Sequence, residues 1–209
     1  MYTQRIIHIA ALGKNADLRR ALEERNATAN AAGSPHALQM RLFSPEPALI
    51  HSIRFENLAA IEVYQDKNAG DSNVAAQTAK ISQFLARPQT SELYQTLVPA
   101  QVSGTPKFSL RNKRCPALGK GPELRRLLEE VARRSVPGRI GASLAAEFVT
   151  PDGPAFVTTS LFASLAGMDQ YRAANTEDAS FRALLSQVNA LLARPAQQEI
   201  LRILVPFPA

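Results

Sequence analysis

Five polar residues that interrupt apolar segments are the candidates for chemistry in this sequence. Two are histidines, His8 and His51, and three are charged, Arg41, Arg54 and Glu147. A histidine that faces a cavity could act as a general base near neutral pH. A charge that is buried requires an opposite charge or a polar ligand. We therefore predict that the two histidines are catalytic and that the three charged residues bind a ligand.

Each candidate also has a structural explanation. Either histidine could be a hydrogen-bonded residue of the core, and Arg41 and Glu147 could lie near strand ends in contact with water. A basic cluster is formed by Arg111, Lys113 and Arg114. Such a cluster could bind an acidic small molecule, or it could protect an exposed edge strand from pairing.

Other types of site have no signature here. The sequence contains no glycine-rich phosphate loop, no metal-ligand spacing and no nucleophile elbow. Its single cysteine, Cys115, cannot form an internal disulfide, and no histidine and asparagine are spaced to activate it. We expect no cofactor and no metal.

Composition and charge place broad limits on the class of protein. The 209 residues are 45% hydrophobic and 20% charged, which is typical of a globular protein with a buried core. The net charge is +6, and most of the excess lies between Lys107 and Arg139. A basic patch can attract nucleic acid or anionic metabolites, but solvated helix faces and one basic strand are the favoured explanation. We find no signal-peptide pattern and no apolar run of roughly 20 residues, so we expect a cytoplasmic protein without membrane contact.

An internal repeat organises the chain. The segment Ala11–Lys14 recurs as Ala117–Lys120, at an offset of 106 residues, and Leu85–Pro88 recurs as Leu192–Pro195, at an offset of 107. Many further matches keep the same register. We predict two copies, residues 1–100 and 107–209, joined by a linker at residues 101–106.

Each copy is expected to fold in the order strand, helix, strand, strand, helix, strand. Strands are predicted at 5–10, 38–42 and 50–55 of the first copy, and the second helical region is interrupted near 68–71 and 175–178. Turns are predicted at 44–47 and 150–153. This order is the ferredoxin-like α+β pattern, with both helices on one face of an antiparallel sheet. The strands carry apolar residues on both faces, so we expect the two sheets to face each other as an intramolecular α/β barrel around a cavity.

The chain as a whole resembles the dimeric α/β-barrel superfamily, in particular its NIPSNAP-like and antibiotic-biosynthesis-monooxygenase-like branches. The resemblance lies in Leu12–Lys14, in Phe55–Leu58 and Phe162–Leu165, and in the endings Glu92–Pro99 and Glu199–Pro208. The resemblance implies a cavity between the sheets. Families of this fold include cofactor-free monooxygenases, isomerases and haem enzymes. A haem enzyme would need a histidine on a helix, whereas His8, His36 and His51 are all expected on or beside strands.

These observations favour a protein that binds a small apolar molecule with a polar group in the inter-sheet cavity. The resemblance suggests a cofactor-independent monooxygenase or isomerase, and the alternative is a non-catalytic binding or assembly module. Pairing of two chains into a homodimer is left open.

A tandem RNA-binding protein would share the strand and helix order, but it would need aromatic residues on its open sheet face to stack bases. Pro154, Thr159 and His8 occupy the positions where aromatic residues are required, and only Phe156 fits. We therefore do not expect nucleic acid as a partner.

Overall fold

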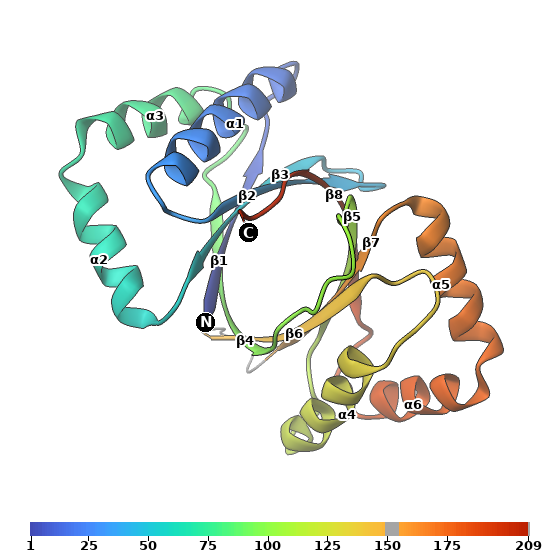
Figure 1. Cartoon of the computed structure of the whole chain (residues 1–209). Helices are drawn as coiled ribbons and strands as arrows, with labels where there is room; N and C mark the ends of the chain where they lie inside the picture. Colours follow the sequence, from blue (N-terminus) through green and yellow to red (C-terminus); the bar gives the residue numbers. More distant parts are fainter. Residues whose placement is uncertain (149–154, 209) are drawn as a thin grey trace. The chain divides into compact units, whose positions relative to one another are not determined.

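A computed structural model describes residues 1–148 and 155–208 of the chain (Figure 1). The chain divides into two compact units. Unit 1 comprises Met1–Leu93 and Ile203–Ala209, and unit 2 comprises Tyr94–Arg202. The turn predicted at 150–153 lies outside the described residues.

Unit 1 contains the elements of the first repeat. Their bounds are β1 Tyr2–Ile9, α1 Asn15–Ala31, β2 His36–Leu42, β3 Ala48–Phe55, α2 Leu58–Ala69 and α3 Ser72–Ser82. The unit also holds the start of β4, Thr90–Val98, and the end of β8, Gln197–Val205.

Unit 2 contains the elements of the second repeat. Their bounds are β5 Phe108–Arg114, α4 Gly121–Arg133, β6 Gly141–Glu147, β7 Phe156–Phe162, α5 Leu165–Glu177 and α6 Ala179–Ala190. The end of β4 pairs with β6 in this unit, and the start of β8 pairs with β5.

The strands are hydrogen-bonded in the order β1-β3-β2-β8-β5-β7-β6-β4, which is the order of a closed barrel. The pairings within each unit are antiparallel, for example β1 with β3 and β5 with β7. The predicted fold class is therefore confirmed: α+β, two ferredoxin-like βαββαβ repeats, and an eight-stranded barrel order among the described residues.

Local capping explains why the second helical region of each repeat is broken in two. Asn57 and Ser164 cap the starts of α2 and α5, as side-chain acceptors for backbone amides. Asp71 and Asp178 are in turn the N-caps of α3 and α6, so a new helix begins after each of them. A capping side chain satisfies an amide that would otherwise lack a partner, which is worth about 1 kcal/mol.

The core of each unit lies between its sheet and its helices. In unit 2 the helix α4 buries Leu124, Leu127 and Leu128 against β6 and β7. In unit 1 the helix α1 buries Leu18 and Leu22 against Leu38 and Leu49 of the sheet. Full burial of a leucine side chain stabilises a fold by roughly 1.5–3 kcal/mol. These contacts therefore fix which face of each sheet is covered by helices.

The structure corrects one expectation from the sequence. The basic cluster of Arg111, Lys113 and Arg114 does not protect an edge strand, because β5 pairs with β7 on one side and with β8 on the other. Each of its three side chains is instead bonded to a side chain of another strand: Glu199, Glu147 and Thr158, respectively.

Candidate functional site

Both histidines predicted to be catalytic point toward the helices of unit 1. His8 lies directly opposite Leu49, and His51 lies directly opposite Leu38. Both leucines belong to the core beneath α1. Directly opposed residues of an antiparallel pair share a face of the sheet. The two imidazoles are therefore enclosed between the sheet and α1, and each is 0% exposed.

The third histidine joins them in a buried cluster. His36 Nδ1 lies 2.8 Å from His51 Nε2, and its other ring nitrogen lies 3.1 Å from the hydroxyl of Ser34. The rings of His8 and His51 are stacked with their centroids 6.4 Å apart. In the His36–His51 hydrogen bond one ring nitrogen donates and the other accepts, so at least one of these two imidazoles is neutral.

The pKa values agree with this geometry. Burial, followed by the positive charge of Arg25, lowers the pKa of His8 and that of His36 to about 4. Burial also lowers the pKa of His51 well below its ordinary value, with added repulsion from His36, Arg25 and His8. All three histidines are consequently uncharged at neutral pH.

Several buried polar atoms of this cluster and of helix α1 have no hydrogen-bond partner. They are both ring nitrogens of His8, Nδ1 of His51, and both polar side-chain atoms of Asn26 on α1. Asn26 is fully buried on α1, one helical step beyond Leu18 and Leu22. Sequence reasoning missed this asparagine. The signal was present in the sequence: Leu18 and Leu22 are spaced by four residues along one face of the helix, and the next position on that face is the polar Asn26. The second repeat has Ala132 at the matching position.

The three residues predicted to bind a ligand lie on the opposite side of their sheets. Arg41 follows Met40, which packs against the core, and Arg54 lies between Ile53 and Phe55, which are both in the core. Side chains alternate along a strand, so both arginines point away from the helices. Glu147 follows the core residue Ala146 in unit 2 and also points away.

Arg54 has an aromatic partner within unit 1. Its guanidinium carbon lies 4.2 Å from the centre of the Phe207 ring, which is the geometry of a cation–π contact. Burial lowers the pKa of Arg54 from its ordinary value, and the group nevertheless stays charged at neutral pH.

A partly buried arginine–glutamate pair occurs at matching positions in the two repeats. Arg5 lies 2.6 Å from Glu92 in unit 1, and Arg111 lies 2.8 Å from Glu199 in unit 2. Both arginines are on the helix-free face of their sheet, because Ile6 and Leu110 beside them face the core. The sequence signal for these pairs was that both repeats carry the same residues at matching positions: Arg5 and Arg111 are 106 residues apart, and Glu92 and Glu199 are 107 residues apart.

Unit 2 carries a larger group of polar side chains on its helix-free face. Lys113 Nζ lies 2.9 Å from a carboxylate oxygen of Glu147, and Glu147 is directly opposite Tyr94. The guanidinium of Arg111 lies 5.2 Å from the centre of the Tyr94 ring. We call these residues the polar face of unit 2: Tyr94, Arg111, Lys113, Glu147 and Glu199.

The helix side of unit 2 has different chemistry. The residues equivalent to His8 and His51 are Arg114 and Thr158, and the guanidinium of Arg114 donates to the Thr158 hydroxyl at 2.6 Å. Burial lowers the pKa of Arg114. Phe156, the aromatic residue considered for base stacking, is part of the helix-side core and does not lie on the open face.

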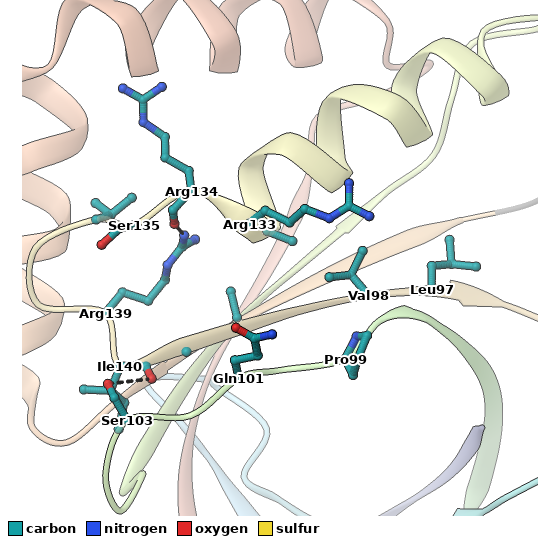
Figure 2. A pocket seen from close by; sticks show the side chains of 14 residues that line it. Leu97, Val98, Pro99, Gln101, Ser103, Arg133, Arg134, Ser135, Arg139 and Ile140 are labelled. Carbon is teal, nitrogen blue, oxygen red and sulfur yellow. Dashed lines mark hydrogen bonds between the residues drawn. The ribbon is translucent and has the colours of Figure 1, made fainter.

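A pocket of about 630 Å³ lies entirely within unit 2, at the C-terminal end of α4. Its walls are the end of β4, the segment after it, the end of α4 and the start of β6 (Figure 2). The lining residues are Leu97, Val98, Pro99, Gln101, Ser103, Ala132, Arg133, Arg134, Ser135, Val136, Arg139, Ile140, Gly141 and Ala142.

Among residues 1–148 and 155–208, no group of three or more His, Cys, Asp or Glu side chains is placed to hold a metal ion. No helix in that part of the chain is both long enough and apolar enough to cross a membrane.

Comparisons with known proteins reveal similarity of structure without similarity of sequence. No protein-family profile and no curated protein sequence matches the chain. A proposed monooxygenase from Fusobacterium nucleatum is 10% identical, with a TM-score of 0.76 over 97% of this chain and 92% of that one. A proposed monooxygenase from Lactobacillus acidophilus is also 10% identical, with a TM-score of 0.67 over 97% and 93%.

A third solved structure, an anthrone oxidase-like protein, is 13% identical, with a TM-score of 0.66 over 97% of this chain and 91% of that one. At these identities the comparisons establish the fold alone. The chain therefore shares, as a tandem of two repeats, the α+β barrel fold of these three solved structures.

Proposed function

We propose that the chain binds a small, largely apolar molecule with one polar group, and that the polar face of unit 2 holds that group. The supporting observation is the pair Arg111–Glu199, placed on the helix-free face with Arg111 only 8% exposed. Buried ion pairs contribute little net stability compared with apolar residues of similar size. Charges on a face without helices are therefore better explained by recognition of a ligand than by packing.

The chemistry of the polar face supports a ligand that carries oxygen. The Arg111 guanidinium and the Tyr94 hydroxyl are donors of the kind that bind a carbonyl or phenolic oxygen. Tyr94 is 3% exposed, and its ring would contact the apolar part of the same ligand.

A second candidate function is cofactor-independent oxidation of that ligand. It is favoured by the similar structures, two of which are proposed monooxygenases and one of which is an anthrone oxidase-like protein. Anthrone is an apolar ring system with a single ketone oxygen, so it suits both candidate functions as a probe.

Binding would be measured by titrating the protein with anthrone and following the emission of the ligand, which is free of tryptophan background because the chain has no tryptophan. We expect saturable binding to the unaltered protein. Arg111→Gln should weaken it by about tenfold, because a charged hydrogen bond to the ligand is lost. Arg19→Gln is the control, since Arg19 is an exposed residue of α1.

Equal affinity of the two variants and the unaltered protein would contradict the assignment to the polar face. An oxygen electrode then separates the two functions. Oxygen uptake upon addition of anthrone would support oxidation, whereas saturable binding without uptake would identify the chain as a binding protein for this compound.

A further inference from the structure

The two repeats differ at the C-terminal end of their first helix, and this difference creates the pocket of unit 2. The helix α1 continues to Ala31, whereas α4 ends at Arg133, the position that matches Ala27. The α4 helix is thus shorter by about one turn. The chain that follows leaves the space at the helix end open.

In unit 1 the same place is filled by polar side chains. Asn30, on the extra turn of α1, donates to the backbone oxygen of His36 at 3.1 Å and accepts from its backbone nitrogen at 2.7 Å. The matching residues in unit 2 are Val136 and Ala142, which line the pocket, and Val136 has no side-chain amide to bond the backbone of Ala142. The second repeat has therefore exchanged an internal polar contact for an open, partly apolar space.

The charges of the pocket have one sign. Its lining includes Arg133, Arg134 and Arg139 and no acidic residue. The C-terminal end of a helix carries a partial negative charge that would repel an anion. Arg139 offsets that charge, because its guanidinium donates to the backbone oxygens of Val131 and Arg134 at the end of α4.

The three arginines are not equally available to a ligand. Arg134 is bonded to Asp178 at 2.7 Å, and Figure 2 shows its side chain extending away from the segment that forms the opposite wall. Arg133 extends above Val98 and Leu97 in the same view. Its partner is Glu129 at 3.3 Å, and the Arg133 side chain is 64% exposed. An ion pair this exposed contributes little, so a ligand anion can replace it.

Below Arg133 the wall is apolar and is formed by Leu97, Val98 and Pro99 (Figure 2). Ile140, just before β6, also lines the pocket, beside the polar residue Ser103. The volume of about 630 Å³ is within the range of pockets that enclose small organic ligands. An apolar wall beneath an exposed guanidinium suits a molecule with an apolar chain and a negative end.

We propose that this pocket binds a small carboxylate with an apolar chain, with the carboxylate on Arg133 and the chain along Leu97, Val98 and Ile140. This site is separate from the polar face of unit 2 and does not depend on the function proposed there. The apolar wall residues position the apolar chain of the ligand. Because the charged residues of the lining are all positive, the pocket favours an anion over a neutral or cationic molecule.

The test is isothermal titration with three probes of equal chain length: octanoate, octanol and octylamine. We expect saturable binding of octanoate with one site per chain, and at least tenfold weaker binding of the other two. Arg133→Gln should weaken octanoate binding by about tenfold, because a guanidinium–carboxylate pair is lost. Arg126→Gln is the matched control, since Arg126 is an exposed arginine of the same helix outside the pocket.

Three results would overturn the proposal: no octanoate binding, equal binding of octanol, or equal loss in the Arg126 and Arg133 variants. Arg111→Gln distinguishes this site from the polar face. If Arg111→Gln abolishes octanoate binding while Arg133→Gln leaves it unchanged, the carboxylate binds at the polar face and the pocket assignment is wrong. If only Arg133→Gln weakens it, the pocket assignment stands whatever the outcome with anthrone.

Discussion

Arg111 and Glu199 face each other across β5 and β8, with a guanidinium nitrogen 2.8 Å from a carboxylate oxygen, on the side of the sheet that no helix covers. The first repeat builds the same pair from Arg5 and Glu92. Both copies thus keep a partly buried ion pair at one place in the sheet. On the helix side the copies have diverged, with histidines in one and an arginine–threonine pair in the other.

Removing one member of this pair should cost more than removing both. We expect Arg111→Met to lower the free energy of unfolding by about 2–4 kcal/mol, because the partly buried Glu199 carboxylate loses its ion pair with the guanidinium. The double variant Arg111→Met with Glu199→Met should recover at least half of that loss. Urea unfolding followed by circular dichroism measures both. A double variant less stable than Arg111→Met would show that the pair itself stabilises the fold.

The histidine cluster should make unit 1 sensitive to acid. In the unfolded chain a histidine binds a proton near its ordinary pKa of 6.5, but in the folded protein His8 and His36 do so only near pH 4. Between these values the unfolded state holds more protons, so stability rises with pH and falls as the solution is acidified. Each of the two histidines should lower the free energy of unfolding by up to about 3 kcal/mol as the pH falls from about 7 to about 4.

Urea unfolding at several pH values between these limits measures this loss. Replacing His8 by leucine supplies the control, because it removes one titrating group and should flatten the profile. A stability that stays constant from neutral to acid pH would contradict the arrangement.

His8 and His36 should respond differently to an apolar replacement at neutral pH. Neither ring nitrogen of His8 has a partner, so His8→Leu removes two unsatisfied polar atoms and should leave stability unchanged or raise it by about 1 kcal/mol. His36→Leu removes the partner of His51 and should lower stability by about 1–3 kcal/mol. Thermal unfolding at neutral pH compares them.

The same His8→Leu variant tests the predicted catalytic role. Loss of oxygen uptake with anthrone in a protein of unchanged stability would establish that His8 takes part in the reaction. Unchanged uptake would leave it as a core residue.

Two glycines with the same backbone conformation should differ sharply on substitution. Gly33 and Gly138 both have φ of +78°, which an L side chain rarely adopts. A Cβ at Gly33 would meet nothing within 4 Å, whereas one at Gly138 would overlap the backbone oxygen of Gly167. Gly33→Ala should therefore cost about 1–2 kcal/mol from backbone conformation alone. Gly138→Ala should cost at least about 2 kcal/mol more, since backbone must move.

Urea unfolding of the two alanine variants measures the difference. Equal losses would indicate that the loop containing Gly138 can move away from α5 without cost.

The sequence by itself determined the order of elements and the two-copy architecture. These features depend on local or periodic signals, which can be recognised without knowledge of the tertiary structure. The signals are the composition of the strands, the capping residues Asn57 and Ser164, and the matched offsets between the repeats. The strand alternation also determined that Arg41 and Gln39 share one face while Leu38 and Met40 share the other. The limits of the two copies and the roles of the five candidate residues remain predictions.

Tertiary structure alone decided which face each residue occupies in the folded unit. Both faces of the strands carry apolar residues, and only the packing of α1 against Leu38 and Leu49 shows that His8 and His51 are covered by a helix. The partners of Arg5 and Arg111 are 87 and 88 residues distant in the sequence, beyond any local signal. The pocket of unit 2 likewise depends on where α4 ends, because the loss of one helical turn opens a space that no single residue predicts.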